Sequence, residues 1–91
     1  MRAAVYAGEG RVELREVRKP VPASGEILLR TLFCGICGSD VRIWRRGSPR
    51  VKPPLTLGHE FSGEVVEVGG QVTRFKVGDR VTSYPAIPCL R

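Results

Sequence analysis

The sequence lacks any apolar run long enough to cross a lipid bilayer, which takes about 20 consecutive apolar residues. It also lacks the apolar segment of a signal peptide, because residues 1–6 lead directly into Gly8, Glu9 and Gly10. We therefore expect no membrane association and a cytoplasmic location. Apolar residues make up 42% of the chain and charged residues 26%, which is typical of a folded globular protein and argues against disorder.

A dinucleotide-binding unit is also missing. That unit needs a strand, a Gly-x-Gly-x-x-Gly turn and a helix in succession, whereas Gly8 and Gly10 stand near the terminus without this context. The 91 residues therefore predict one small domain, residues 1–91, whose core is modest.

Histidine and cysteine are scarce: the chain has one histidine, His59, and three cysteines. An odd number of cysteines in an unexported chain favours metal binding or catalysis over disulfide bonds. Cys34 and Cys37 form a C-x-x-C pair, but a redox motif would require a βαβ context and a closed zinc knuckle would require a second pair. We expect Cys34 to be a buried cysteine at a strand end.

The charge is unbalanced, with 15 basic and 9 acidic residues and a formal net charge of +6. Several basic residues cluster in one stretch, namely Arg42, Arg45, Arg46, Arg50 and Lys52. No recognised nucleic-acid motif accompanies them, so we expect no nucleic-acid partner. Two explanations stay open: a solvated loop, or recognition of an anionic substrate or cofactor phosphate by the bidentate geometry of arginine.

Alternating apolar and charged residues and β-branched runs predict a mainly β fold, with strands over residues 3–6, 12–17, 26–33, 64–68 and 80–84. Glycine and proline clusters separate these runs at short intervals, which favours a small antiparallel barrel or sandwich. One short helix is expected over residues 41–46, with Ser39 and Asp40 as N-cap candidates and Gly47 as the stop.

Two short segments combine the side chains that bind zinc: Cys37, and the pair His59 and Glu60. Three protein ligands leave a fourth position for water or substrate, which distinguishes catalytic zinc sites from structural ones. Adjacent strand residues point to opposite faces, so His59 and Glu60 can share a metal only if the backbone is irregular, a freedom that Gly58 provides. Otherwise Glu60 lies behind the metal or pairs with an arginine.

Ser39 and Asp40 are the candidates for catalytic support. Asp40 could accept the second ring N–H of a metal-bound histidine, and Ser39 could take the proton of an alcohol bound beside the metal. The alternative for both residues is a plain helix cap.

Three segments together, GICGSD (35–40), PLTLGHEFSG (54–63) and FKVGDRV (75–81), resemble the zinc-containing medium-chain alcohol and polyol dehydrogenases, nearest to the polyol (sorbitol-like) and sugar-alcohol-phosphate branches. The resemblance implies a GroES-like, partly open antiparallel β-barrel over residues 1–91, with a short helix after Cys37. It implies a catalytic Zn²⁺ on Cys37, His59 and Glu60, with Ser39 as the proton-relay hydroxyl and Asp40 as the partner of the zinc-bound histidine.

The implied reaction is hydride transfer between a small-molecule alcohol or polyol and NAD or NADP, with zinc polarising the substrate hydroxyl. NAD or NADP would bind only to the full-length form, which would be a homo-oligomer, and these 91 residues alone would be inactive. Cys89 would be the first of four cysteines of a structural zinc site that is incomplete here. Ile43 stands where the polyol branch usually has tyrosine. The competing hypothesis is a non-enzymatic barrel that self-associates or binds an acidic partner.

Overall fold

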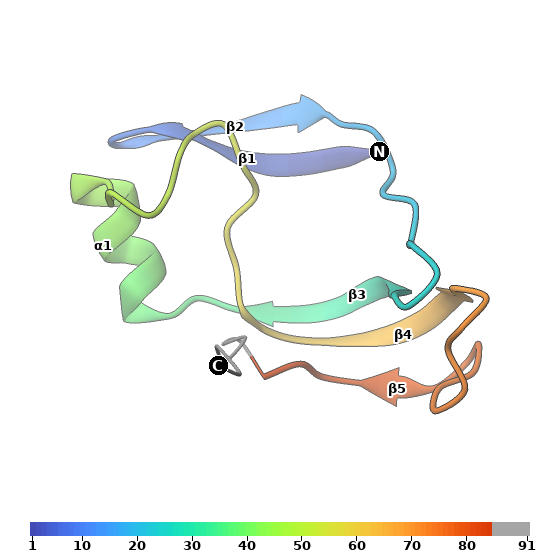
Figure 1. The fold of residues 1–91 in the computed structure, drawn as a ribbon. Coiled ribbons are helices and arrows are strands. Elements are labelled where there is room, and N and C mark those ends of the chain that lie inside the picture. The colour runs from blue at the N-terminus through green and yellow to red at the C-terminus, as the bar shows by residue number, and fades with distance from the viewer. Residues whose placement is uncertain (85–91) are drawn as a thin grey trace. The chain divides into compact units, whose positions relative to one another are not determined.

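The computed structural model describes residues 1–84, and the mainly β prediction is confirmed. Five strands and one helix follow the order β1 (Arg2–Gly8), β2 (Arg11–Glu16), β3 (Ile27–Gly35), α1 (Gly38–Arg46), β4 (Glu60–Val68) and β5 (Arg80–Val81) (Figure 1). They form two antiparallel sheets, β1-β2 and β3-β4-β5, and both sheets are open.

The chain divides into two compact units that interleave along the sequence. The first unit comprises Met1–Lys19 and Ile36–Gly58, and therefore contains β1, β2 and α1. The second unit comprises Pro20–Gly35 and His59–Arg91, and contains β3, β4 and β5.

The first unit is organised by the β1-β2 hairpin. Gly8 and Gly10 have φ values of 135° and 70°, so glycine supplies the backbone conformations that the connection needs. Tyr6 extends this pairing to Leu55, because each backbone N–H donates to the other residue's carbonyl, at 2.7 and 3.2 Å. Val5 and Tyr6 are 4% and 2% exposed and form the core of this unit.

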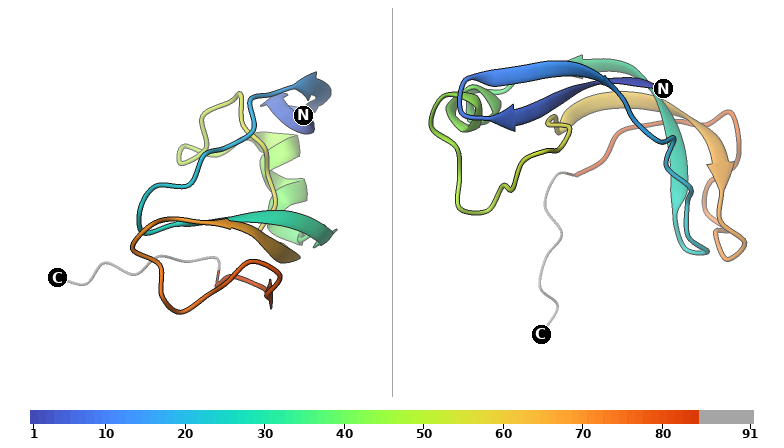
Figure 2. Two further views of the ribbon diagram at one scale, coloured as in Figure 1. Left: turned by 90° about the vertical axis from the view of Figure 1, so that its right-hand side faces the viewer. Right: turned by 90° about the horizontal axis from the view of Figure 1, so that it is seen from above.

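The second unit is organised by β3 and β4, which pair from Ile27↔Val68 to Gly35↔Glu60. Two register irregularities, between Leu28 and Leu29 and between Thr31 and Phe33, interrupt this ladder. Such bulges bend a strand and increase its twist, and Figure 2 shows the curvature of β4. Val65 on β4 is fully buried and is the core residue of this unit.

Two strand boundaries differ from the sequence prediction. β4 begins at Glu60 rather than at residue 64, because pairing with the last residues of β3 supplies the hydrogen bonds that sequence alternation does not reveal. A glycine suits position 63 on this strand, because a Cβ atom there would lie 3.0 Å from the Arg30 carbonyl oxygen, closer than most Cβ contacts. The strand predicted over residues 80–84 ends at Val81, after which the Thr82 hydroxyl donates to the Phe61 carbonyl at 2.6 Å in place of a backbone bond.

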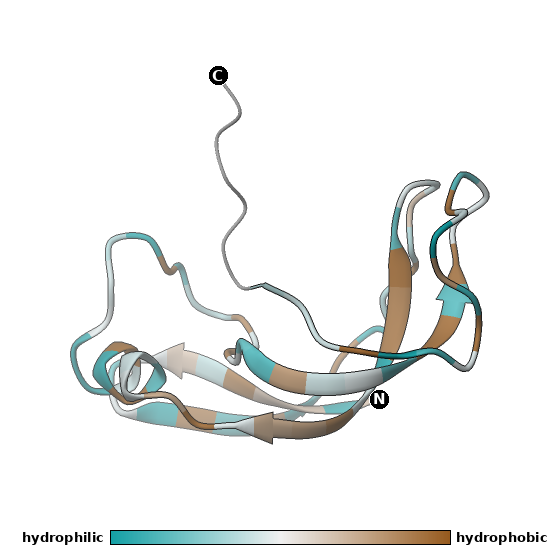
Figure 3. Ribbon diagram, turned by 90° about the horizontal axis from the view of Figure 1, so that it is seen from below, coloured by the Kyte–Doolittle hydropathy of each residue, from teal (hydrophilic) through white to brown (hydrophobic). Residues whose placement is uncertain are grey.

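Many large apolar side chains of the described residues are exposed, and hydrophobic colouring runs along the strands in Figure 3. Leu14 is 69% exposed and Phe33 is 78% exposed. Since apolar burial is the main stabilising contribution to folding, residues 1–84 by themselves hold only a small hydrophobic core. The one helix of residues 1–84 is too short to cross a membrane.

The turn after β4 generates the first testable prediction. A Cβ atom on Gly69 would lie 2.1 Å from the Ala23 carbonyl oxygen, whereas one on the neighbouring Gly70 would meet no atom within 4 Å. We expect Gly69→Ala to lower the free energy of unfolding by about 2 kcal/mol through this clash. Gly70→Ala should change it by less than about 1 kcal/mol, in chemical denaturation of the two variants. Equal effects of the two substitutions would contradict the close packing of this turn.

Candidate metal centre

Cys37 is the N-cap of α1, with the extended backbone angles φ −89° and ψ 154°. Its carbonyl accepts hydrogen bonds from the N–H groups of Asp40 and Val41, at 3.0 and 3.3 Å. In return Asp40 Oδ2 accepts the Cys37 N–H at 3.1 Å. These reciprocal bonds fix the backbone from which the half-buried Cys37 side chain projects, at the helix end that favours negative charge.

The predicted helix start was wrong. Ser39 and Asp40 are the expected N-caps, but α1 begins at Gly38, so Ser39 is the second helical residue and Asp40 the third. Asp40 still serves the helix start, from the third position, because its carboxylate satisfies the Cys37 N–H. A carboxylate has two oxygens and several acceptor positions, so this bond leaves Asp40 able to serve a further donor. The predicted stop is confirmed: Gly47 has φ 71° and donates its N–H to the Ile43 carbonyl at 2.8 Å.

His59 and Glu60 lie at the start of β4, where the backbone is irregular. Gly58 has φ 133°, a conformation that L-residues rarely adopt, and His59 precedes the first strand residue, Glu60. A ring nitrogen of His59 and a carboxylate oxygen of Glu60 lie within 4.8 Å of each other. The alternation of a regular strand therefore does not separate these two side chains.

The register of β3 and β4 limits how far Cys37 can lie from this pair. Gly35, the last residue of β3, pairs directly with Glu60, and Cys37 follows Gly35 by two residues. Consecutive Cα atoms are about 3.8 Å apart and paired Cα atoms about 5 Å, so connectivity alone keeps Cys37 near the start of β4. The Glu60 carboxylate also lies against Gly35, with Oε2 3.5 Å from the position of a Cβ atom there. The position of Gly35 beside the Glu60 carboxylate was not predicted from the sequence. The available clue was a glycine at the end of a strand, just before a candidate ligand.

Cys34 differs from Cys37 in its environment, and the prediction that it is buried was wrong. It lies on β3 opposite Phe61 and is exposed, because this end of β3 has no covering layer among the described residues. Neither Cys34 nor Cys37 is in a disulfide bond. Cys89 falls outside the described residues, so its structural-zinc role stays a prediction.

An ion pair in the turn before β5 perturbs one carboxyl group away from the candidate ligands. The Lys76 ammonium donates to Asp79 at 2.7 Å and the Lys76 backbone N–H donates at 3.0 Å, and both bonds lower the pKa of the Asp79 carboxyl. This pair of the exposed Lys76 and the half-buried Asp79 connects the two ends of the turn before β5. We assign it a local structural role.

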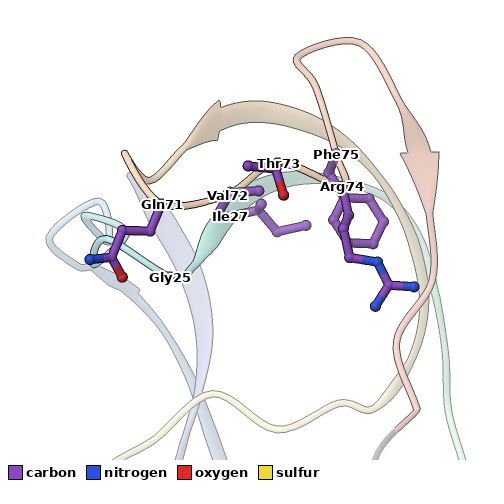
Figure 4. A pocket seen from close by; sticks show the side chains of 7 residues that line it. All are labelled: Gly25, Ile27, Gln71, Val72, Thr73, Arg74 and Phe75. Carbon is purple, nitrogen blue, oxygen red and sulfur yellow. The ribbon is translucent and has the colours of Figure 1, made fainter.

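A cavity of about 270 Å³ opens in the second unit, lined by Ile27, Val72, Phe75 and the polar side chains around them (Figure 4). Ile27 pairs with Val68, at the opposite end of β4 from Glu60. Eight residue steps of about 3.3 Å each separate Glu60 from Val68, so this cavity is not part of the candidate metal centre.

Comparison with known proteins matches residues 23–91 to the alcohol dehydrogenase GroES-like domain. The sorbitol dehydrogenase of Gallus gallus is 48% identical over 85 residues, covering 90% of this chain and 23% of the relative. A Neosartorya fischeri protein assigned as D-xylulose reductase A is 45% identical over 89 residues, covering 91% of this chain and 25% of the relative. A Sinorhizobium meliloti structure assigned as a zinc-binding dehydrogenase, with NADP bound, has a TM-score of 0.91 at 39% identity and covers 99% of this chain and 26% of its own. The chain thus spans about a quarter of the length of these proteins.

The backbone at Gly58 can be tested directly. We expect Gly58→Ala to destabilise the chain by about 1–3 kcal/mol, because alanine at φ 133° is strained whatever space surrounds it. Gly38→Ala, at the first residue of α1, is the matched control: a Cβ there meets nothing within 4 Å, and alanine favours a helix. Chemical denaturation should show a loss for the first variant and none for the second, and a Gly58→Ala variant of unchanged stability would contradict the irregular backbone before β4.

Proposed function

The chain belongs to the family of alcohol dehydrogenase GroES-like domains, and from this premise we propose that Cys37, His59 and Glu60 bind one catalytic zinc ion. A thiolate, an imidazole and a carboxylate are the three ligand types that zinc takes from proteins. His59 and Glu60 already lie with donor atoms within 4.8 Å of each other, and connectivity holds Cys37 near them. The proximity of the His59 and Glu60 donor atoms at the start of β4 is the observation that supports this proposal.

When bound at these three residues, zinc would act as a Lewis acid that polarises a substrate hydroxyl at its open position. Residues around the proposed ligands would fix their backbone and orientation. The Asp40 carboxylate accepts the Cys37 N–H and the Asp40 N–H donates to the Cys37 carbonyl, which fixes the first turn of α1. We assign Asp40 the further role of orienting His59, because a carboxylate on the second ring nitrogen selects the tautomer that binds metal.

Ser39 follows Cys37 by two residues, on the first turn of α1, and is half-buried. We assign its hydroxyl the acceptance of the proton that the substrate hydroxyl loses, and its transfer toward solvent. A hydroxyl can accept one proton while donating its own, so Ser39 moves a proton without becoming charged.

The substrate class proposed is a small-molecule alcohol or polyol, in line with the sorbitol dehydrogenase and D-xylulose reductase relatives. NAD or NADP would be the hydride acceptor in the whole protein, which would act in the cytoplasm as a homo-oligomer. The 91 residues span about a quarter of the relatives' length and contain no dinucleotide-binding motif. We therefore propose that they supply the metal side of the active site and do not turn over alcohol alone.

Zinc binding by the chain tests the ligand set. We expect about one zinc ion per chain, with Cys37→Ser lowering the affinity by more than about 100-fold, since even the loss of a ligand's outer partner typically costs about 10–100-fold. Serine is a better N-cap than cysteine, so this variant keeps the start of α1. Cys34→Ser is the matched control and should bind zinc as the parent chain does, in competition titrations with a chromophoric chelator. Equal losses in the two serine variants would contradict the proposed centre, and the absence of zinc binding would favour the non-enzymatic barrel.

The role of Ser39 is tested in a longer polypeptide that carries a nucleotide-binding domain. We expect Ser39→Ala to lower kcat for alcohol oxidation by about 100-fold or more, because the substrate proton then has no acceptor. Ser24→Ala, at an exposed loop serine of the second unit, should leave kcat unchanged. Removal of zinc should abolish the reaction in both variants. Full activity of the Ser39→Ala enzyme, or of the metal-free enzyme, would contradict the mechanism.

A further inference from the structure

Cys34 is an exposed thiol three residues before the proposed zinc ligand Cys37. Free cysteine is among the most buried residue types in proteins, so a cysteine on the surface of β3 is unusual. The Cys34 thiol donates to the adjacent Gly35 carbonyl at 3.6 Å, a local contact that leaves the side chain exposed. The C-x-x-C pair therefore has one member that the proposed zinc centre does not use.

Covalent connectivity limits the separation of the two cysteines. Three residue steps place their Cα atoms at most about 10–11 Å apart, whatever the arrangement of the two compact units. A disulfide bond needs Cα atoms about 4.4–6.8 Å apart, and the first and last Cα atoms of a β-turn lie less than about 7 Å apart. A turn over residues 34–37 would therefore bring Cys34 and Cys37 within range of a disulfide bond.

The two residues between the cysteines suit such a turn. Gly35 would take the first central position, where a type II′ turn needs the positive φ that glycine adopts without steric cost. Ile36 would take the second central position; it is 83% exposed and belongs to no strand or helix. Gly35 forms the terminal pair of the β3-β4 ladder, opposite Glu60. The turn would thus break only the last pairing of that ladder.

We propose that Cys34 and Cys37 form a disulfide bond on exposure to a hydroperoxide, and that this bond and bound zinc exclude each other. The inference rests on the proposed function, because Cys37 is taken as a zinc ligand. Zinc binds a thiolate, whereas the sulfur of a disulfide carries no charge. The oxidised chain keeps only His59 and Glu60 of the proposed ligands. Cys34 is therefore the residue that makes the metal centre sensitive to oxidants.

The oxidation needs one hydroperoxide molecule for each disulfide bond. The Cys34 sulfur attacks one oxygen of hydrogen peroxide, the O–O bond breaks, and the Cys34 sulfenic acid and water form. The Cys37 sulfur then attacks the Cys34 sulfur, the S–S bond forms, the S–O bond breaks, and a second water leaves. The two thiols lose two hydrogens and two electrons, and the peroxide is reduced to water. Such a modification is not a catalytic dithiol and needs no βαβ context.

Peptide mapping of the 91-residue chain after treatment with hydrogen peroxide tests the disulfide bond. Trypsin cleaves after Arg30 and Arg42, so residues 31–42 form one peptide that holds both cysteines and loses two hydrogens on oxidation. We expect this product in the metal-free chain, and dithiothreitol should reverse it. At a free zinc concentration of about 100 times the Kd, about 1% of the chain is metal-free, so the disulfide should form about 100-fold more slowly.

Cys34→Ser is the matched control, because it removes the exposed thiol and keeps all three proposed ligands. After a brief peroxide treatment that completes the disulfide in the parent chain, this variant should still bind zinc in a chelator titration. The parent chain should bind zinc again only after reduction. Equal losses of zinc binding in the two chains would overturn the inference, since Cys37 would then be oxidised without Cys34.

Three further results would overturn it: no disulfide within residues 31–42, a cross-link of Cys34 to Cys89 in its place, or equal zinc binding by the oxidised and reduced chains. The absence of zinc binding by the reduced chain would instead contradict the proposed function. The two failures are distinguishable, because the mass of the peptide reports the disulfide bond in the metal-free chain.

Discussion

The pairing of Gly35 with Glu60 is the constraint on which the candidate site depends. This single rung of the β3-β4 ladder sets the last residue of one strand against the first residue of the other. The chain reaches Cys37 two residues after Gly35 and passes His59 one residue before Glu60. Covalent connectivity and this one backbone pairing therefore limit the distance between backbone positions that lie about twenty residues apart in sequence.

Two local conformations then direct the side chains. Positive φ at Gly58 frees His59 from strand alternation, so that its ring and the Glu60 carboxylate approach each other. The reciprocal bonds between Cys37 and Asp40 fix the backbone at the start of α1. Metal binding would add stability to such a chain, because a metal that binds only the folded state contributes its binding free energy to folding. That contribution matters here, since only Val5, Tyr6 and Val65 among the described apolar residues are buried.

Much of the fold could be predicted from local pattern. Alternation located β2, and the apolar and β-branched runs located β3 and most of β4, because each of these features depends on neighbours within a few residues. The helix start could not be predicted in the same way. Ser39 and Asp40 are residue types that favour the N-cap more than cysteine does, but the N-cap is Cys37. Asp40, the third helical residue, accepts the Cys37 N–H with its carboxylate.

The candidate site residues could be named from the sequence for chemical reasons, whereas their geometry could not. One histidine next to a carboxylate, with a thiol after a glycine, is a restricted donor set, and motif spacing pointed to the family that the comparison confirms. Whether Glu60 could reach the same point as His59 depended on the φ of Gly58, which spacing does not encode. Cys34 is exposed because no layer among the described residues covers this end of β3, a long-range property that local sequence does not contain.

The most direct test of the central claim is the X-ray absorption spectrum of the zinc-loaded chain at the zinc edge. The proposed centre predicts one sulfur ligand at about 2.3 Å, with the remaining ligands nitrogen or oxygen at about 2.0–2.2 Å. A first shell with two sulfurs, as a Cys34–Cys37 chelate would give, or with none, would contradict a site built by Cys37, His59 and Glu60.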